Sequence, residues 1–232
     1  PGAGTTSHAL LKDINPGAGS SGSNSPELVW APAVNLAFFM ADDGTTGSEL
    51  WATDGTAAGT YLVKDIHPTG SSNPGLAFAA LGGVFFSATD GSAGYELWFS
   101  DGTAANTFLV KDINSGSGSS TPQKYAMLGS YLYFSADDGV NGRELWRTDG
   151  TAAGTTLVLD IAAGTASGSP GPFIAYGGYL FFNAFTASEG FELWRTDGSA
   201  AGTTLFLDIS SGTASGSPQH FVQYAGKFWF RG

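Results

Sequence analysis

The sequence predicts an all-β chain folded as a β-propeller, with five blades of four antiparallel strands. Three observations carry this prediction. A phrase repeats about every 48 residues, each repeat contains four strand-like segments, and one of those segments is apolar on both faces. No stretch sustains a 3.6-residue apolar period, so we expect almost no helix.

The repeat is clearest in "ELWRTDGTAAGTTLVLDI" at 144–161 and "ELWRTDGSAAGTTLFLDI" at 192–209. The glutamates that open the phrase are spaced 47, 48 and 48 residues apart: Glu49, Glu96, Glu144 and Glu192. The aspartates of the closing "DI" pair recur five times: Asp13, Asp65, Asp112, Asp160 and Asp208. A fixed period of this length indicates that each copy is one supersecondary unit of a repeat architecture.

One unit reads as four short strands, as residues 173–209 illustrate. The segments "FIAY", "YLFFNAF", "ELWRTD" and "TTLFLDI" are rich in aromatic and β-branched residues. Gly177-Gly178, a polar loop and "GSAAG" separate them and are typical of turns. The unit is therefore expected to be an antiparallel meander.

The second segment of each unit is apolar on both faces, for example at Phe85-Phe86 and at 179–182. A sheet with one wet face would alternate apolar and polar residues, so each sheet is expected to lie between two neighbours. Four-stranded sheets repeated radially describe a β-propeller. The alternative is a β-solenoid, whose coils are usually shorter.

The two ends of the chain match parts of one further unit. Residues 4–14 resemble a fourth strand, and 221–232 resemble the first two strands, but the third strand is missing. We expect a single domain over 1–232, with units at about 15–66, 67–113, 114–161 and 162–209 and a closing blade shared by 210–232 and 1–14. The alternative is a piece of a longer array, and the start at Pro1 suggests a mature product or an excised fragment.

Composition narrows the class of partner. The net charge is -11, from 20 acidic and 9 basic residues, so nucleic acid and anionic membranes are unfavourable partners. The chain contains no cysteine, which excludes disulfides, thiolate metal sites and cysteine nucleophiles. No segment reaches the roughly 18 apolar residues of a membrane span, so we expect no membrane insertion.

The phrase "ELWATDGTAAGTYLVKDI" at 49–66 resembles the ELWxxDGT repeat of large secreted or surface-associated bacterial proteins, and the resemblance covers nearly the whole chain. The layout is also similar to the TolB-like propeller repeat, and the Asp-Gly turn to the Asp-box of sialidase propellers, at a different spacing. The resemblance implies a bacterial extracellular or cell-surface protein. It implies no activity, because the family is defined by its repeat.

The tryptophans divide into two groups. Four stand at one place in every unit and are interpreted as wedges between blades, each burying about 200 Å², rather than as sugar-stacking platforms: Trp51, Trp98, Trp146 and Trp194. Trp30 and Trp229 lie outside the phrase and are the candidates for exposed, ligand-binding aromatics.

The acidic residues have structural and functional interpretations. The "TDG" aspartates suit tight turns: Asp54, Asp101, Asp149 and Asp197. The "DI" aspartates suit the crossing to the next blade or the lining of a central channel.

The pairs Asp42-Asp43 and Asp137-Asp138 precede a glutamate and are candidate Ca²⁺ ligands. Their spacing is not that of an EF-hand, and the fourth copy lacks the pair, so solvated turns are the alternative.

The polar connections between units, such as "NSGSGSSTP" and "AAGTASGSPGP", should emerge beside the loop between the second and third strands. Hydroxyls and carboxylates repeated on one face suit weak multivalent binding of a polar polymer such as a glycan. Flexible linkers are the alternative interpretation.

An enzyme is disfavoured. His8, His67 and His220 occupy unrelated places in their units, and no serine has the context of a nucleophile elbow. The sequence therefore predicts a non-catalytic extracellular binding or adhesion module, with a glycan or another surface protein as partner and Ca²⁺ as the only candidate cofactor. The alternative is a structural spacer or assembly unit of a larger surface protein or filament.

Overall fold

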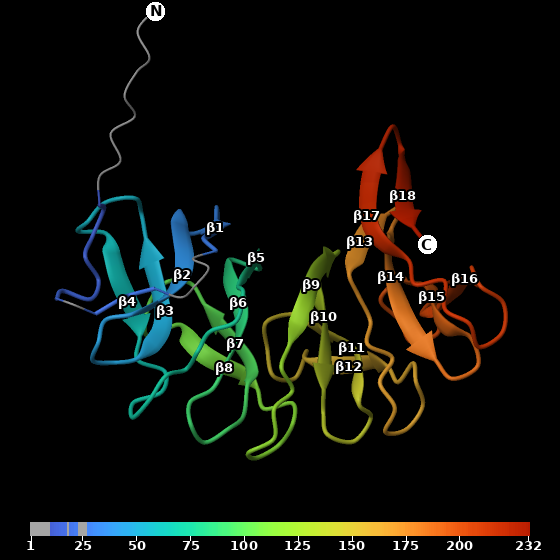
Figure 1. Cartoon of the computed structure of the whole chain (residues 1–232), viewed down its shortest axis with the longest axis horizontal. Coiled ribbons are helices and arrows are strands. Elements are labelled where there is room, and N and C mark those ends of the chain that lie inside the picture. The colour runs from blue at the N-terminus through green and yellow to red at the C-terminus, as the bar shows by residue number, and fades with distance from the viewer. Residues whose placement is uncertain (1–9, 18, 23–26) are drawn as a thin grey trace, which may run out of the picture.

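The computed structural model describes residues 10–17, 19–22 and 27–232, and their regular structure is entirely β (Figure 1). The first sheet contains β1 (Val29–Ala31), β2 (Leu36–Asp42), β3 (Ser48–Thr53) and β4 (Thr60–Lys64). The second contains β5 (Phe78–Ala80), β6 (Gly83–Ala88), β7 (Glu96–Ser100) and β8 (Thr107–Lys111). The third contains β9 (Gln123–Leu128), β10 (Tyr131–Asp137), β11 (Arg143–Thr148) and β12 (Thr156–Leu159). The fourth contains β13 (Phe173–Tyr176), β14 (Tyr179–Thr186), β15 (Gly190–Thr196) and β16 (Thr204–Leu207), and β17 (Gln219–Tyr224) pairs with β18 (Lys227–Arg231).

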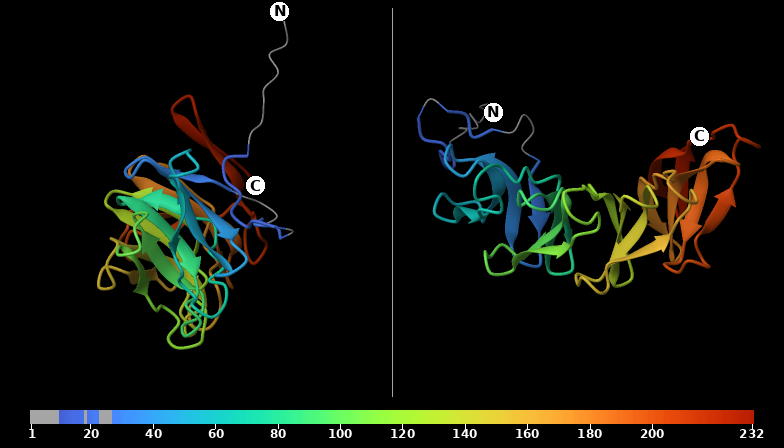
Figure 2. Two further views of the ribbon diagram at one scale, coloured as in Figure 1. Left: turned by 90° about the vertical axis from the view of Figure 1, so that its left-hand side faces the viewer. Right: turned by 90° about the horizontal axis from the view of Figure 1, so that it is seen from below.

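Each of the four complete sheets is an antiparallel meander in sequence order, as the sequence predicts. The expected hairpin turn between β13 and β14 is confirmed at Gly177 and Gly178, whose φ angles of 60° and 83° suit glycine. The sheets follow one another in a curved row, with the first strands on its inner side (Figures 1 and 2). This arrangement is propeller-like.

Three hydrophobic cores lie between consecutive sheets. Neighbouring residues of one strand serve different cores: Phe86 packs against the first sheet, and Phe85 packs against the third. Both rings are fully buried. The predicted burial of the second strand on both faces is therefore confirmed, and it follows from sheets stacked side by side.

The four repeated tryptophans are buried, with exposed fractions of 5% to 9%: Trp51, Trp98, Trp146 and Trp194. Trp98, Trp146 and Trp194 each belong to the core shared with the preceding sheet. The interpretation as wedges between sheets is confirmed for Trp98, Trp146 and Trp194, whereas Trp51 is buried but belongs to none of the three cores.

The expected closing blade is not formed in the part of the chain that the structure describes. β17 and β18 match the first two strands of a unit, but residues 10–14 form no strand, and residues 4–9 lie outside the described residues. The described N-terminal segment and the C-terminal pair lie at opposite ends of the row, so the ring is open (Figure 2). The physical reason is that residues 1–232 contain the "ELW" phrase four times, once in each complete sheet, so no described strand pairs with the second edge of β18. None of the described segments forms a helix long and apolar enough to cross a bilayer.

Candidate binding surface

Two loops lie side by side at one end of every complete sheet, and we call them the loop pair. One loop joins the second and third strands, and the other leads to the next sheet. The start of the third strand donates its N–H to a serine hydroxyl of the other loop at 3.0 Å in all four sheets: Ser48 to Ser71, Tyr95 to Ser119, Arg143 to Ser167 and Phe191 to Ser215. The prediction that these loops share one face is therefore confirmed.

A buried glutamate anchors each loop pair from below. Glu49 is 0% exposed and accepts N–H groups of Ile66 at 3.1 Å and Ser72 at 2.8 Å, together with the Ser72 hydroxyl at 2.5 Å. The arrangement recurs at Glu96, Glu144 and Glu192, which accept the N–H groups of Ile113, Ile161 and Ile209. No role was predicted for these glutamates from the sequence. The signal was their fixed offset of 17 residues from the isoleucine of "DI".

We call the N–H and hydroxyl groups that bind each buried glutamate its cradle. The four cradles differ in one donor. Glu49 and Glu96 receive a serine hydroxyl from Ser72 or Ser120, whereas Glu144 and Glu192 face Gly168 and Gly216 at the same place. Burial raises the pKa of Glu96, and the donors from Ser120 and Ile113 oppose this shift. Burial raises the pKa of Glu144 to about 7, although the N–H groups of Gly168 and Ile161 favour its ionised form.

The candidate calcium ligands cap their own turns. Asp43 Oδ1 accepts the N–H groups of Thr46 at 2.7 Å and Thr45 at 2.8 Å, and the Thr46 bond is the main cause that lowers the pKa of Asp43 to about 2. Asp42 accepts the N–H of Gly44 at 2.7 Å.

The equivalent pair in the third sheet, Asp137 and Asp138, accepts N–H groups of Gly139, Val140 and Asn141. Burial acts to raise the pKa of Asp138, but the Asn141 and Val140 N–H groups hold it below its ordinary value. The two pairs lie in different sheets, and no cluster of three metal-ligating acids or histidines occurs among the described residues. The local bonds support the solvated-turn alternative, and calcium binding stays a prediction.

The "TDG" aspartates behave as turn residues in all four sheets. Each accepts the N–H of the residue two positions on at 2.8–2.9 Å: Asp54, Asp101, Asp149 and Asp197. Beneath each turn two buried hydroxyls bond to each other, as Thr148 and Thr155 do at 2.7 Å. Asp112 and Asp160 bond to the N–H of Gly116 and Gly164, and so hold the crossing to the next sheet.

Trp30 and Trp229 are exposed as predicted, at 53% and 54%, but the structure does not bring them together. Trp30 lies on β1 and Trp229 on β18, at opposite ends of the row. Trp229 and Phe181 occupy equivalent places in their sheets. Each is the third residue of its strand, counted from the strand pair next to the hairpin turn, which is Tyr224–Lys227 in one sheet and Tyr176–Tyr179 in the other. Phe181 is only 5% exposed, whereas Trp229 is 54% exposed, because no third strand and no following sheet cover it among the described residues.

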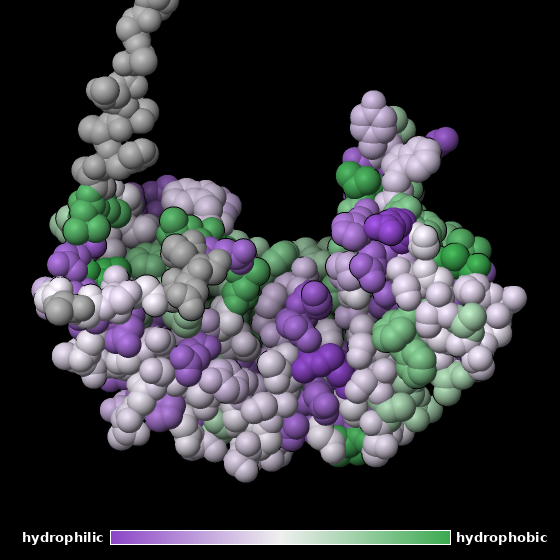
Figure 3. Space-filling model, in the orientation of Figure 1, coloured by the Kyte–Doolittle hydropathy of each residue, from purple (hydrophilic) through white to green (hydrophobic). Residues whose placement is uncertain are grey.

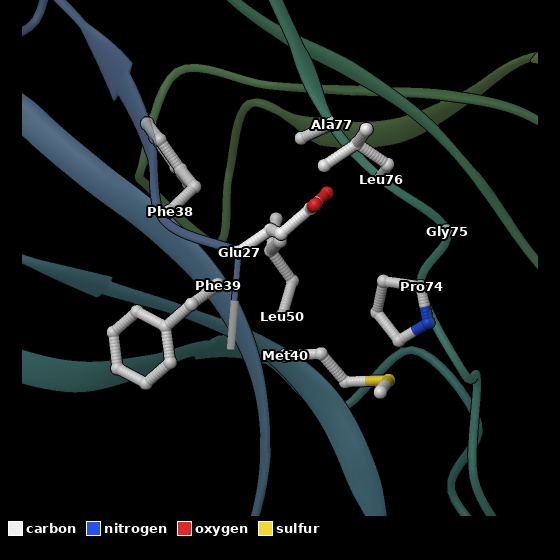
Figure 4. Close-up of a pocket in the computed structure, with 9 residues that line it drawn as sticks. All are labelled: Glu27, Phe38, Phe39, Met40, Leu50, Pro74, Gly75, Leu76 and Ala77. Atoms are coloured by element: carbon white, nitrogen blue, oxygen red, sulfur yellow. The ribbon is translucent and has the colours of Figure 1, made fainter. Parts of the chain in front are cut away.

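Two cavities occur at equivalent places near the first strands. One, of about 280 Å³, is lined by Met40, Leu76 and Ala77 among others, and Figure 4 shows the Glu27 carboxylate directed toward Leu76 and Ala77. The other, of about 520 Å³, is lined by Asn183, Lys124 and His220 among others.

The equivalence of the two cavities follows from strand pairing, because Asn183 pairs with Leu193 as Met40 pairs with Leu50. Of the two histidines within the described residues, His67 lies in the loop between β4 and β5 and His220 lies on β17, and His8 lies outside the described residues. The two cavities therefore differ in the polarity of their linings, although they lie at equivalent places of the repeat. They bring no acid-base pair of histidines together.

No family model and no curated protein matches this chain. Among solved structures, the chain is similar to a puromycin hydrolase S511A mutant in complex with PGG (TM-score 0.55, 13% identity, 88% of this chain and 32% of that chain). It is also similar to a prolyl endopeptidase (TM-score 0.52, 13% identity, 88% and 31%) and to oligopeptidase B from Leishmania major (TM-score 0.50, 18% identity, 77% and 26%). The chain thus spans about a third of the length of these proteins or less, and the likeness concerns the fold alone.

Proposed function

We propose that this chain is a non-catalytic extracellular binding module that presents the loop pair repeatedly to a polar polymer such as a glycan. One observation carries the proposal: the same serine-to-backbone bond holds the loop pair in the same geometry in all four complete sheets. Identical shallow sites on a rigid frame gain avidity when the ligand itself repeats.

The number of blades and the protein family of the chain belong to the same proposal. We propose that the sheets are blades of a five-unit propeller and that the chain belongs with the ELWxxDGT-repeat proteins of bacterial surfaces. The four full copies of the phrase support both statements. The acidic surface, with a net charge of -11, supports a neutral or cationic partner rather than nucleic acid.

A glycan array tests the function. The chain should bind one sugar class saturably, and a repeat of the array with EDTA in place of Ca²⁺ tests the calcium hypothesis. Absence of binding in both conditions contradicts the proposal. Loss of binding in EDTA supports a metal ion in the acidic loops. Unchanged binding in EDTA contradicts the calcium hypothesis.

A matched pair of variants locates the site. Ser117 lies exposed on the loop pair, and Ala153 lies exposed in the "TDG" turn of the third sheet. Ser117→Arg should lower the avidity several-fold, whereas Ala153→Arg should leave it unchanged. Equal effects of the two substitutions would place the ligand elsewhere.

A further inference from the structure

The larger cavity, of about 520 Å³, lies where the third sheet, the fourth sheet and β17 meet, and we call it the polar cavity. Its lining includes Lys124, Phe173, Asn183, Gln219, His220 and Phe221. Sites for small molecules usually have volumes of about 300–1,000 Å³. The polar cavity is therefore large enough for a small ligand.

The polar cavity does not depend on the missing strands of the last sheet. The cavity of about 280 Å³ lies at the equivalent place between the first and second sheets, which are both complete. There Met40 holds the place of Asn183, and Leu76 holds the place of His220, two positions after a proline (Figure 4). The repeat thus forms a cavity at this place, and its lining has become polar only beside the fourth sheet.

Asn183 carries the clearest sign that a ligand is missing. The residue is only 8% exposed, and its Oδ1 has no hydrogen-bond partner among the described residues. A buried amide without a partner is unfavourable, and folded proteins satisfy nearly all such groups. Because the oxygen and nitrogen of an amide exchange places when it flips, Asn183 can offer an acceptor or a donor to a molecule in the cavity.

The third sheet shows how the chain itself satisfies the equivalent place. Ser135 holds the place of Asn183 there, and the Arg143 guanidinium donates to the Ser135 carbonyl at 3.1 Å and to its hydroxyl at 3.4 Å. The fourth sheet has Phe191 at the place of Arg143, and Phe191 packs against Phe185 instead. A bound molecule with hydroxyl groups would supply the donor that this phenylalanine lacks.

Irregularities of two first strands place basic side chains at the polar cavity. Lys124 on β9 and His220 on β17 each lie at a shift in strand register and have φ angles of 58° and 54°. Such left-handed backbone is uncommon outside glycine, and bulges often redirect a side chain. No acidic residue lines the cavity, although the chain has a net charge of -11. The polar cavity is therefore locally suited to a negative group.

The rest of the lining combines polar and apolar groups. Gln219 adds a second amide, and Phe173 and Phe221 add aromatic rings. Figure 3 shows hydrophilic surface, in purple, where the start of β17 lies beside β13. A few polar groups beside aromatic surface are typical of sites that orient a small polar molecule.

We propose that the polar cavity binds a small hydroxylated carboxylate of the sugar-acid class. The carboxylate would lie at the Lys124 ammonium, hydroxyl groups would bond to the Asn183 and Gln219 amides, and the C–H face of the sugar ring would lie on Phe173 or Phe221. The inference goes beyond the proposed function and is independent of it, because it uses the lining of the cavity and not the serines of the loop pair.

A titration followed by saturation-transfer NMR tests the proposal with glucuronate as the probe. Glucuronate should bind saturably and at least fivefold more tightly than glucose, which lacks the charge, or hexanoate, which lacks the hydroxyls. Absence of glucuronate binding, or equal binding of the three molecules, would overturn the proposal.

A pair of lysine variants tests whether the charge acts from the cavity. Lys124→Met should weaken glucuronate binding at least fivefold. Lys227→Met removes the same charge from an exposed position of β18 outside the lining, and should leave binding unchanged. Equal effects of the two substitutions would contradict a site at the polar cavity.

The buried amide provides a readout that a folding defect would not reproduce. Asn183→Leu keeps nearly the same shape without the polar atoms, so it should abolish glucuronate binding and raise the melting temperature by a few degrees. Retained binding, or a lower melting temperature, would overturn the role of Asn183. Ser117→Arg on the loop pair should leave glucuronate binding unchanged, so this proposal and the proposed function fail separately.

Discussion

The complete sheets and the C-terminal pair share one strand pattern but bury it very differently. The third residue of the second strand is at most 5% exposed in the complete sheets, at Phe38, Phe85, Tyr133 and Phe181, and 54% exposed at Trp229. The strands themselves have the same pairing to the first strand of their sheet. The difference teaches that burial here is supplied by the third strand and the next sheet, and not by the apolar strand alone.

The largest effect is expected when a tryptophan is replaced in each of the two regions. Trp146→Ala should lower the free energy of unfolding by about 3–5 kcal/mol, because it empties part of a core between two sheets. Trp229→Ala should cost less than about 1 kcal/mol, because that residue is already 54% exposed. Urea unfolding of both variants measures the difference, and similar losses would contradict the comparison.

The buried glutamates provide the next test. The pKa of Glu144 is raised to about 7, so between its ordinary value of 4.5 and about 7 the folded chain holds a proton that the unfolded chain has lost. Stability should therefore fall as the pH rises through this window, by roughly 3 kcal/mol at most. Glu144→Gln should remove this part of the pH dependence, as measured by urea unfolding at pH 5 and pH 8. An identical profile in the variant would show that Glu144 does not titrate in this window.

A smaller effect is expected where a serine completes the cradle. Ser120→Ala removes the hydroxyl that donates to Glu96 at 2.5 Å, and should cost about 1–2 kcal/mol. Ser117→Ala, in the exposed part of the same loop, should leave the melting temperature unchanged. If the two variants melt together, the hydroxyl does not stabilise the cradle.

The smallest effect is expected in the acidic turn. Asp138→Ala removes the acceptor for the Val140 and Asn141 N–H groups and should cost about 0.5–1 kcal/mol by thermal unfolding. The fourth sheet already lacks this aspartate pair and uses Thr186 and Glu189 in the same loop. Calorimetry of the parent protein and of the Asp138→Ala variant at millimolar Ca²⁺ separates the turn role from metal binding. A heat of binding in the parent alone would support the calcium interpretation.

The meander of each sheet could be predicted because its causes are local. Gly177-Gly178 and the "TDG" turns reverse the chain with their own backbone and side-chain bonds, and the repeat period fixes which strands follow. The role of Glu96 could not be predicted in the same way. Its donors lie 17 and 24 residues away along the chain, and meet it only when the loop folds under the sheet.

The sequence by itself determined the all-β repeat, the four meanders and the wedge tryptophans, because turns and adjacent antiparallel strands form between residues close along the chain. Only the tertiary structure decided that the described sheets form an open row, that Trp30 and Trp229 lie at opposite ends of it, and that Phe206 is 46% exposed. Those properties depend on which sheet lies beside which, and a local strand pattern does not contain the neighbour that buries it.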